Sequence, residues 1–525
     1  MRDFRHLLFF PGLLFASVLF PPGMAASPPP GDRPAPSSRA TVIKGALILD
    51  GTGSPGRRSN VRIEGDLIVQ VGKAAPAPGD AVVDGAGLAL APGFIDTHSH
   101  GDDQIFEHGD ALAATSQGIT TLVVGQDGGS YSPLARFFRR LERRPTAVNV
   151  ASYAGHGTIR ERVMGDDFRR HATPEEVERM KRLLGREMRA GAIGLSSGLE
   201  YDPGIYATPE EVIELAKVAA SHGGRYISHI RSEDRSFWKA IDEIIAIGRE
   251  AKLPVQISHT KLAMRNLWGQ ADRLIARLDR ARARGVNITG DMYPYLYWES
   301  TLTVLFPERN FEDRATAALV LEEIATPGGL LMTQFDPEPS YAGRTLAEIA
   351  RVRRSDPVTT LIDMIRMSEA MRKETGRGAE SVIGTSMQEP DVERLLAWRW
   401  MNFCTDGYLE GPHPRGFGSF PRILGRYARG RKVMTIEEAV RKASALAAAN
   451  MGITDRGLIK AGQRADLVLF NPGTILDRAT PADPHATSTG VHKVWVNGVL
   501  VFADQKATDE RPGRVLRRSG SSDGA

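Results

Sequence analysis

Eight short apolar segments recur through the middle of the chain, and most of them are separated by amphipathic stretches. The segments read GFIDTHSH, TTLVVGQD, AVNVASYAGH, GAIGLSSG, RYISHI, VQISHT, NITGDMYP and MNFCTDG. Alternating strand and helix patterns are typical of βα units around a parallel sheet. Eight units predict an α/β fold, a (β/α)8 TIM-like barrel over residues 91–450. Several segments end in polar residues, as expected of a barrel whose active site lies at the carboxyl ends of its strands.

Two of the intervening helices begin with the same four residues, TPEE, at residues 173–176 and 208–211. A threonine at the N-cap, a proline at the first helical position and a glutamate at the third are the elements of a capping box. We therefore expect a capping box at the start of each of these helices.

The segments that flank the barrel show a different pattern, in which short strands are joined by glycine-containing turns. Residues 41–90 and residues 451–518 share this pattern. We expect them to meet in one small β-domain, a β-sandwich, into which the barrel is inserted. Between the seventh and eighth segments, residues 298–399 form a long excursion with helical patterns. We interpret it as an insert that covers the barrel mouth.

Residues 1–25 have the features of a signal peptide. Arg2 and Arg5 precede an apolar run, and small residues lead to Ala25, after which we expect cleavage. The alternative is an uncleaved membrane anchor, which needs about 20 apolar residues, and this run is shorter. Residues 26–40 are proline-rich and predict an extended linker. Together these features predict a periplasmic or secreted protein without a stable membrane anchor.

Charge and cysteine content narrow the classes of function. The 67 basic residues are nearly balanced by 63 acidic ones and are spread among them, which argues against a nucleic-acid-binding surface. The positive balance by itself names no partner. The single cysteine, Cys404, excludes an intrachain disulfide, so the fold must be stabilised by packing or by a metal.

The first barrel segment ends in His98-Ser99-His100. Residues at positions i and i+2 of a strand point the same way, so both imidazoles can face the barrel mouth and chelate one metal ion. A chance HxH pair on the surface is the alternative, and the motif alone leaves both interpretations open.

Three later segments supply further polar residues at their ends. His229 and His259 close RYISHI and VQISHT, and Asp406 follows the last strand in NFCTDG. A single histidine in such a place is usually a satisfied core residue, but four would each need a buried hydrogen-bond partner. Four imidazoles and a carboxylate suit Zn²⁺ better than Mg²⁺ or Ca²⁺. We expect one or two zinc ions, or another divalent metal.

The order of these residues resembles the amidohydrolase superfamily, and several longer stretches resemble its N-acyl-D-amino-acid deacylase (D-aminoacylase) family. The stretches are PGFIDTHSHGDD, GLSSGLEYDPGIYA, ISHTKLAMRNLWG, DMYPY, TDG followed by HPRGFGSFPRILGRY, and DRGLIKAGQRADLVLFNP. They span about residues 41–518. The resemblance implies a metal-dependent hydrolase that cleaves the amide bond of N-acyl-D-amino acids, giving a carboxylate and a free D-amino acid.

The resemblance also implies roles for individual residues. Asp406 would be both a metal ligand and the catalytic group that moves the proton. Lys261, Tyr293 and Arg415 are similar to the groups that hold the substrate carboxylate in related deacylases. His156 either contacts the substrate or braces its own loop. The implied partner is therefore a small molecule that carries a carboxylate.

The second segment departs from the family pattern. It ends in GQDG, with Asp127, where the family typically has GNCG and a cysteine thiolate as metal ligand. A carboxylate can also bridge two metals, and it is a harder ligand than a thiolate. We therefore expect Asp127 to be a metal ligand, while a changed metal preference or lost activity stay open. Glu200 is a second, lower-ranked candidate carboxylate.

Two other functions stay open on sequence grounds. One is a metal-dependent dipeptidase or cyclic amide hydrolase on the same fold. The other is a non-catalytic barrel that binds a metal or a ligand, which the Asp127 exchange makes conceivable. Against the second stands the presence of Asp406 and of all four histidines.

Overall fold

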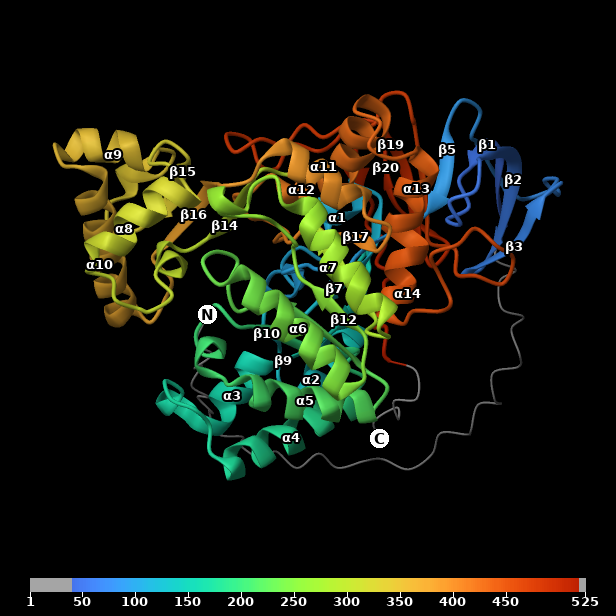
Figure 1. Cartoon of the computed structure of the whole chain (residues 1–525). Coiled ribbons are helices and arrows are strands. Elements are labelled where there is room, and N and C mark those ends of the chain that lie inside the picture. Colours follow the sequence, from blue (N-terminus) through green and yellow to red (C-terminus); the bar gives the residue numbers. More distant parts are fainter. Residues whose placement is uncertain (1–39, 519–525) are drawn as a thin grey trace, which may run out of the picture.

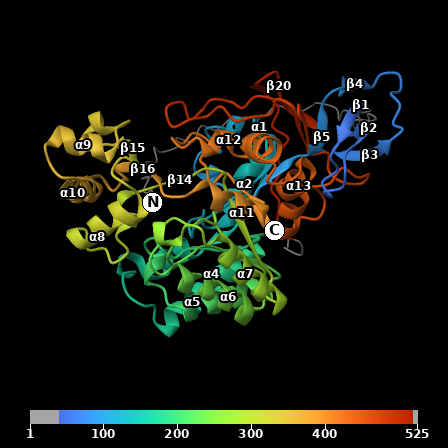
Figure 2. The ribbon, with the colours of Figure 1, turned by 45° about the horizontal axis from the view of Figure 1, so that its top comes forward.

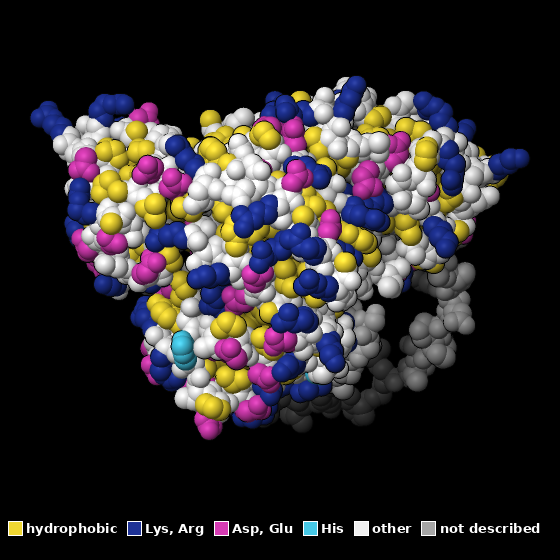
Figure 3. Space-filling model, viewed as in Figure 1, with side chains coloured by type: hydrophobic (Ala, Val, Ile, Leu, Met, Phe, Trp, Pro, Cys, Tyr) yellow, Lys and Arg dark blue, Asp and Glu magenta, His cyan; other side chains and the backbone are white. Residues whose placement is uncertain are grey.

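The computed structural model describes residues 40–518, so the expected signal peptide and all but the last residue of the expected proline-rich linker lie outside the described residues. A central barrel carries a sheet domain on one side and a separate lobe on the other, as two views of the ribbon show (Figures 1 and 2). Among the described residues, no helix is both long and apolar enough to cross a membrane. Basic and acidic side chains are interspersed over the face shown in Figure 3.

The barrel has one parallel strand, or pair of short strands, for each of the eight predicted segments. Backbone hydrogen bonds close its two gaps: Asp406 N donates to His98 O at 2.9 Å, and Ile193 N donates to Ser152 O at 3.0 Å. The predicted (β/α)8 fold is confirmed. In chain order the strands are β6 (Phe94–Asp96), β7 (Ile119–Val124), β8 (Asn149–Ser152), β9 (Ala154–Gly155), β10 (Gly194–Gly198), β11 (Arg225–His229), β12 (Val255–Ile257), β13 (Ile288–Met292) and β17 (Met401–Phe403).

Amphipathic helices surround the strands and bury their apolar sides against them. Leu195 and Val255 on the strands share one buried cluster with Leu215 and Ile244 on the helices. The main helices are α1 (Leu112–Thr115), α2 (Leu134–Arg143), α3 (His156–Met164), α4 (Pro174–Arg189), α5 (Pro209–Ser221), α6 (Phe237–Ala251), α7 (Ala271–Ala283), α11 (Glu389–Ala397), α12 (Arg415–Arg422), α13 (Ile436–Arg441) and α14 (Ala447–Met451).

The two expected capping boxes differ in the structure. Helix α4 has both bonds, from Glu176 N to Thr173 Oγ1 and from Thr173 N to the Glu176 carboxylate. Helix α5 keeps only the bond from its third residue to the N-cap hydroxyl. The second prediction is therefore wrong for the reciprocal bond. The Glu211 carboxylate is buried, and it binds the guanidinium of Arg160 and the ring of His156 instead, because charge-assisted bonds are the stronger ones.

The terminal segments join in a single nine-stranded sheet, which contains β1 (Thr41–Ile48), β2 (Arg57–Glu64), β3 (Leu67–Gly72), β4 (Ala81–Asp84), β5 (Ala89–Pro92), β18 (Leu467–Phe470), β19 (Val491–Val496), β20 (Val499–Ala503) and β21 (Lys506–Ala507). Strands β5 and β18 pair antiparallel, with Leu90 opposite Leu469. This pair unites the two ends of the chain. Its core is a separate apolar cluster that includes Ile43, Val61 and Trp495.

The excursion between the seventh and eighth barrel strands folds into the lobe. Strands β14 (Tyr297–Ser300), β15 (Leu330–Phe335) and β16 (Glu380–Thr385) form an antiparallel sheet, accompanied by α8 (Arg314–Leu319), α9 (Leu346–Arg353) and α10 (Pro357–Thr375). The lobe begins directly after β13, at the carboxyl end of the barrel. The Arg309 guanidinium ties it to the loop after β10 by donating to Asp202 Oδ1 and to Glu200 O, each at 3.0 Å.

Candidate metal centre

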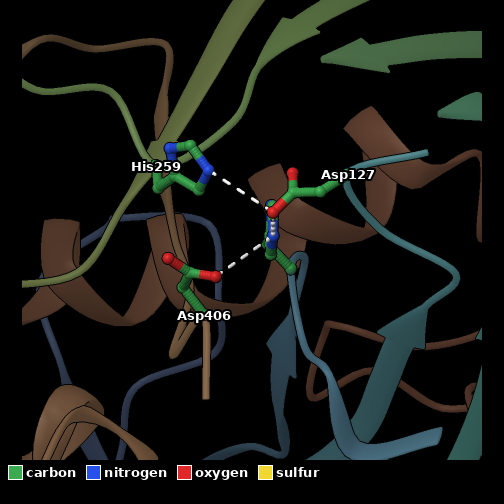
Figure 4. Close-up of side chains that lie close together, drawn as sticks. Asp127, His259 and Asp406 are labelled. Atoms are coloured by element: carbon green, nitrogen blue, oxygen red, sulfur yellow. Dashed lines mark ion pairs between the residues drawn. The ribbon is translucent and has the colours of Figure 1, made fainter. Parts of the chain in front are cut away.

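The residues expected to bind metal converge at the carboxyl ends of the barrel strands. Ligand atoms of His98, Asp127, His259 and Asp406 all lie within 4.8 Å of one another. These residues follow β6, β7, β12 and β17, respectively. In Figure 4 the side chains of Asp127, His259 and Asp406 point toward a common centre. We call these four residues, together with His100, the first ligand group.

Distances in the first ligand group match those between ligands of one ion. Asp127 Oδ2 lies 3.4 Å from Nε2 of both His98 and His100. Asp406 Oδ1 lies 3.3 and 3.2 Å from the same two nitrogens. Two ligand atoms at about 2.05 Å from a tetrahedral Zn²⁺ ion are about 3.3 Å apart. The spacing therefore fits a shared cation.

Unpartnered polar atoms support the same interpretation. Both ring nitrogens of His98 and Oδ1 of Asp127 are buried, and none of them has a hydrogen-bond partner among residues 40–518. A buried polar atom without a partner costs free energy, so native structures pair nearly all such atoms. The donor set, with imidazole nitrogens and carboxylate oxygens, is one that Zn²⁺ accepts. The residues present thus fit a divalent metal.

The electrostatics of the first ligand group favour a cation. Burial opposes charge on His98, yet Asp127 and Asp406 raise the pKa of its ring to about 10. Burial also opposes charge on Asp127, but His98 and His259 hold the pKa of its carboxyl well below the usual range. Two ionised carboxylates therefore face the centre from β7 and β17, the strands on either side of β6.

Three of these ligands have an unusual backbone. Asp127, His259 and Asp406 have φ angles of 50°, 34° and 50°. This left-handed region is uncommon for residues other than glycine, and each such residue costs on the order of 1 kcal/mol. The sharp turn after each strand directs the side chain inward, so the fold sustains strain where the ligands converge.

A layer of carboxylates beneath the ligands holds their backbone in place. Asp291 on β13 accepts a hydrogen bond from His259 N at 2.6 Å. Asp96 on β6 accepts one from Thr405 N at 2.9 Å. Both carboxylates are fully buried. They fix the turns that precede or contain His259 and Asp406.

His229 belongs to a second cluster, which it forms with His259 and Glu233. His229 Nε2 lies 2.8 Å from Glu200 Oε2, and its Nδ1 lies 3.0 Å from His259 Nε2. The lower-ranked Glu200 is thus in contact with a predicted ligand. Glu233 was missed by the sequence analysis. Its signal is the charged run SEDR, which begins three residues after His229, the last residue of β11.

The three residues expected to bind a carboxylate lie on two sides of the centre. Arg415 Nη1 forms an ion pair with Asp406 Oδ2 at 2.6 Å, and its guanidinium carbon lies 4.8 Å from the centroid of the Tyr293 ring. Lys261 Nζ instead contacts both Glu233 oxygens at 2.6 Å. The structure therefore brings Arg415 and Tyr293 together and places Lys261 in the second cluster.

His156 lies outside both clusters. Its Nε2 is 2.9 Å from Glu211 Oε1, and the ring is fully buried at the start of α3. This contact ties the start of α3 to α5, and the two roles left open for this histidine stay predictions.

The chain matches known proteins over nearly its whole length. The model of the amidohydrolase family matches residues 81–401 and 339–502. N-acyl-D-glutamate deacylase of Alcaligenes xylosoxydans xylosoxydans is 37% identical over 92% of this chain and 98% of its own length. D-aminoacylase of the same organism is 35% identical over 91% and 98%.

Solved structures agree with these relatives. The crystal structure of a D-aminoacylase superposes with a TM-score of 0.81 at 34% identity, covering 91% of this chain and 99% of its own. An N-acyl-D-glutamate deacylase from Bordetella bronchiseptica, complexed with zinc and a phosphonate mimic of the tetrahedral intermediate, gives the same values. A D-hydantoinase at 15% identity and a TM-score of 0.56 shares the fold. From its sequence, its barrel and its cluster of metal-binding side chains, the chain belongs to the amidohydrolase family.

Proposed function

We propose that this chain hydrolyses the amide bond of N-acyl-D-amino acids and uses a divalent metal, zinc in the first instance. The observation that carries the proposal is the first ligand group, in which imidazole nitrogens and carboxylate oxygens surround one point and three of these atoms have no hydrogen-bond partner among residues 40–518. The named activities of relatives that are 34–37% identical over more than nine-tenths of the chain supply the substrate class.

Asp406 has the position and the charge of the proton-transferring group. Burial opposes its ionisation, but Arg415 and His259 hold the pKa of its carboxyl well below the usual range. It is therefore an ionised base at neutral pH. A divalent cation, when bound, would lower the pKa of a water molecule and polarise the scissile carbonyl. Asp406 then accepts the water proton and returns it to the amine, which must be protonated to leave.

Arg415 and Tyr293 offer donors for the substrate carboxylate. Arg415 Nε and the Tyr293 hydroxyl are buried, and neither has a hydrogen-bond partner among residues 40–518. A carboxylate placed between them would satisfy both and would gain a charge-assisted bond. Lys261 is the third proposed contact, and it would exchange part of its bond with Glu233 for the ligand.

A substrate panel on the purified mature protein tests the function. It contains N-acetyl-D-methionine, N-acetyl-L-methionine, a dipeptide and a cyclic imide, and metal content is measured on the same samples. We expect turnover of the acylated D-amino acid with one or two zinc ions per chain. Turnover of the dipeptide or the imide alone would replace the proposal with one of the two alternative hydrolases. A metal-containing protein that hydrolyses none of them would support the non-catalytic barrel.

We also propose that the protein is exported to the periplasm or beyond. The support is the sequence of residues 1–25, with its basic start, apolar run and small residues before Ala25. Expression of the full chain in a bacterial host, followed by fractionation and N-terminal sequencing, tests this. Mature protein beginning at Ala26 is expected, and full-length protein in the cytosol would contradict the proposal.

A further inference from the structure

Glu299 lies on β14, the first strand of the lobe. The ring of Tyr297, two residues earlier, lies 4.8 Å from the ring of His413, and His413 Nε2 donates to Tyr297 O at 3.1 Å. His413 in turn accepts a bond from Arg415 N, which orients the Arg415 backbone. Alternate residues of a strand share a face. Glu299 therefore lies on the face of β14 that is turned toward Arg415.

The charges that act on Glu299 are those of the site. Burial raises the pKa of its carboxyl, and Arg415 is the strongest of the charges that oppose this. Asp406 and His100 also act on it. Burial raises the pKa of Tyr408 as well, and Glu299 contributes more to that rise than any other charge. Tyr408 stacks on His100 with ring centroids 5.3 Å apart. The charges of Arg415, Asp406 and His100 thus reach the Glu299 carboxylate.

Glu299 has no cation of its own. Its carboxylate accepts one hydrogen bond, from Ser381 Oγ at 3.2 Å, and within residues 40–518 it makes no salt bridge. Glu233, on the other side of the centre, is bound by Lys261 through both oxygens. A partly buried carboxylate without a counter-ion loses hydration that a single hydrogen bond replaces only in part. A cationic group on a ligand would restore the missing interaction.

We propose that Glu299 selects substrates that carry a positively charged nitrogen close to the scissile amide, and that it disfavours acidic side chains. This inference rests on the proposed hydrolase function and narrows its substrate class. The nitrogen could belong to either half of the substrate: the side chain of the D-amino acid, as in an acylated D-lysine, or the acyl half, as in the α-ammonium group of a dipeptide. The shared chemistry is an ammonium group that pairs with Glu299.

Isosteric substrate pairs test this proposal. N-acetyl-D-lysine is compared with N-acetyl-D-norleucine, and glycyl-D-norleucine with N-propionyl-D-norleucine, because each pair differs mainly by one charge. We expect kcat/KM to favour the cationic member of at least one pair by about tenfold, the size of one charge-assisted bond. The pair that shows the preference identifies which half of the substrate meets Glu299.

Variants test whether Glu299 causes the preference for cationic substrates. Glu299→Gln keeps the shape of the side chain and should abolish the preference, while Glu299→Lys should reverse it in favour of N-acetyl-D-glutamate. Glu374→Gln changes an exposed carboxylate on the same lobe and should leave the preference intact. The proposal is overturned if neither cationic substrate exceeds its neutral partner, or if Glu299→Gln keeps the preference.

A binding measurement separates this inference from the proposed function. Calorimetry with D-lysine, D-norleucine and glycyl-D-norleucine, in the metal-loaded protein, needs no turnover. Failure to hydrolyse any substrate would refute the proposed function alone. In that case, tighter binding of D-lysine or of the dipeptide than of D-norleucine in wild type, lost in Glu299→Gln, still supports the role of Glu299. Equal binding of all three would refute it.

Discussion

In the described part of the chain, buried charged groups have hydrogen-bond partners at one end of the barrel and lack some of them at the other end. At the amino-terminal end, Asp466 accepts hydrogen bonds from Asn149 Nδ2 at 3.0 Å and from the guanidinium of Arg456. At the carboxyl end, His98 and Asp127 keep buried atoms that have no hydrogen-bond partner among residues 40–518. Because the fold can satisfy a buried carboxylate at one end, the unpartnered atoms at the other end mark where a ligand belongs. Changes at the mouth should therefore alter activity, and changes at the amino-terminal end should alter stability.

The largest expected effect is at the mouth, in Asp406→Asn. An amide cannot accept the water proton, so we expect kcat to fall about 1000-fold or more, equivalent to roughly 4 kcal/mol. Zinc content should be retained, because the other ligands of the first group remain. Steady-state kinetics and elemental analysis measure the two quantities. Asp504→Asn, at an exposed turn, is the matched control. A fully active Asp406→Asn protein would exclude the proton-transfer role.

At the amino-terminal end of the barrel, Asp466→Asn should lower stability and leave activity unchanged. Arg456 and Asp466 are both buried, and removal of one charge leaves the other partly uncompensated. We expect the free energy of unfolding to fall by about 3 kcal/mol, measured by urea denaturation. The kcat of the folded variant should match that of wild type. A drop in kcat without a loss of stability would break the contrast between the two ends.

Arg415→Lys tests whether Arg415, at the barrel mouth, recognises the substrate carboxylate. Lysine keeps the charge but loses the planar fork that can bind Asp406 and a substrate carboxylate at once. We expect kcat/KM for N-acetyl-D-methionine to fall about 30-fold, roughly 2 kcal/mol. For N-acetyl-D-methioninamide, which lacks the carboxylate, kcat/KM should fall by a smaller factor than for the acid. An equal loss for both compounds would remove Arg415 from carboxylate recognition.

The smallest effect, when it is expressed per pH unit, is a pH dependence of stability near the amino-terminal end of β17. Lys442 Nζ donates to the backbone oxygens of Leu396 and Trp398, and burial lowers its pKa from 10.5 to about 7. Between these values the unfolded chain holds a proton that the folded chain has released. Stability should therefore rise with pH across this window, by up to about 1.4 kcal/mol per pH unit.

Lys442→Met removes this ionisation and should flatten the rise in stability between pH 7 and the unfolded pKa. Denaturant unfolding at a series of pH values measures the slope. Lys460→Met, at an exposed position, should keep the wild-type slope. An unchanged slope in Lys442→Met would show that other groups cause the pH dependence.

The parts of the fold that were predictable from sequence depend on local patterns. Each barrel strand is a short apolar run, and the polar residues that close these runs are visible without a structure. Contacts made through packing leave a weaker signal. Glu233 lies in a charged run whose contact with the histidines only the fold reveals, and Glu299 lies in an unremarkable aromatic stretch. Glu211 matched a capping box, but His156 and a buried arginine compete for its carboxylate.

The pairing of β5 with β18 has a consequence for how the protein is made. Synthesis from the amino terminus delivers β5 to the ribosome exit long before its partner strand exists. The edge of β5 that pairs with β18 stays unpaired while the entire barrel is translated. Completion of the sheet then requires the last part of the chain, so a prematurely terminated product retains a bare strand edge of the kind that aggregates or is degraded.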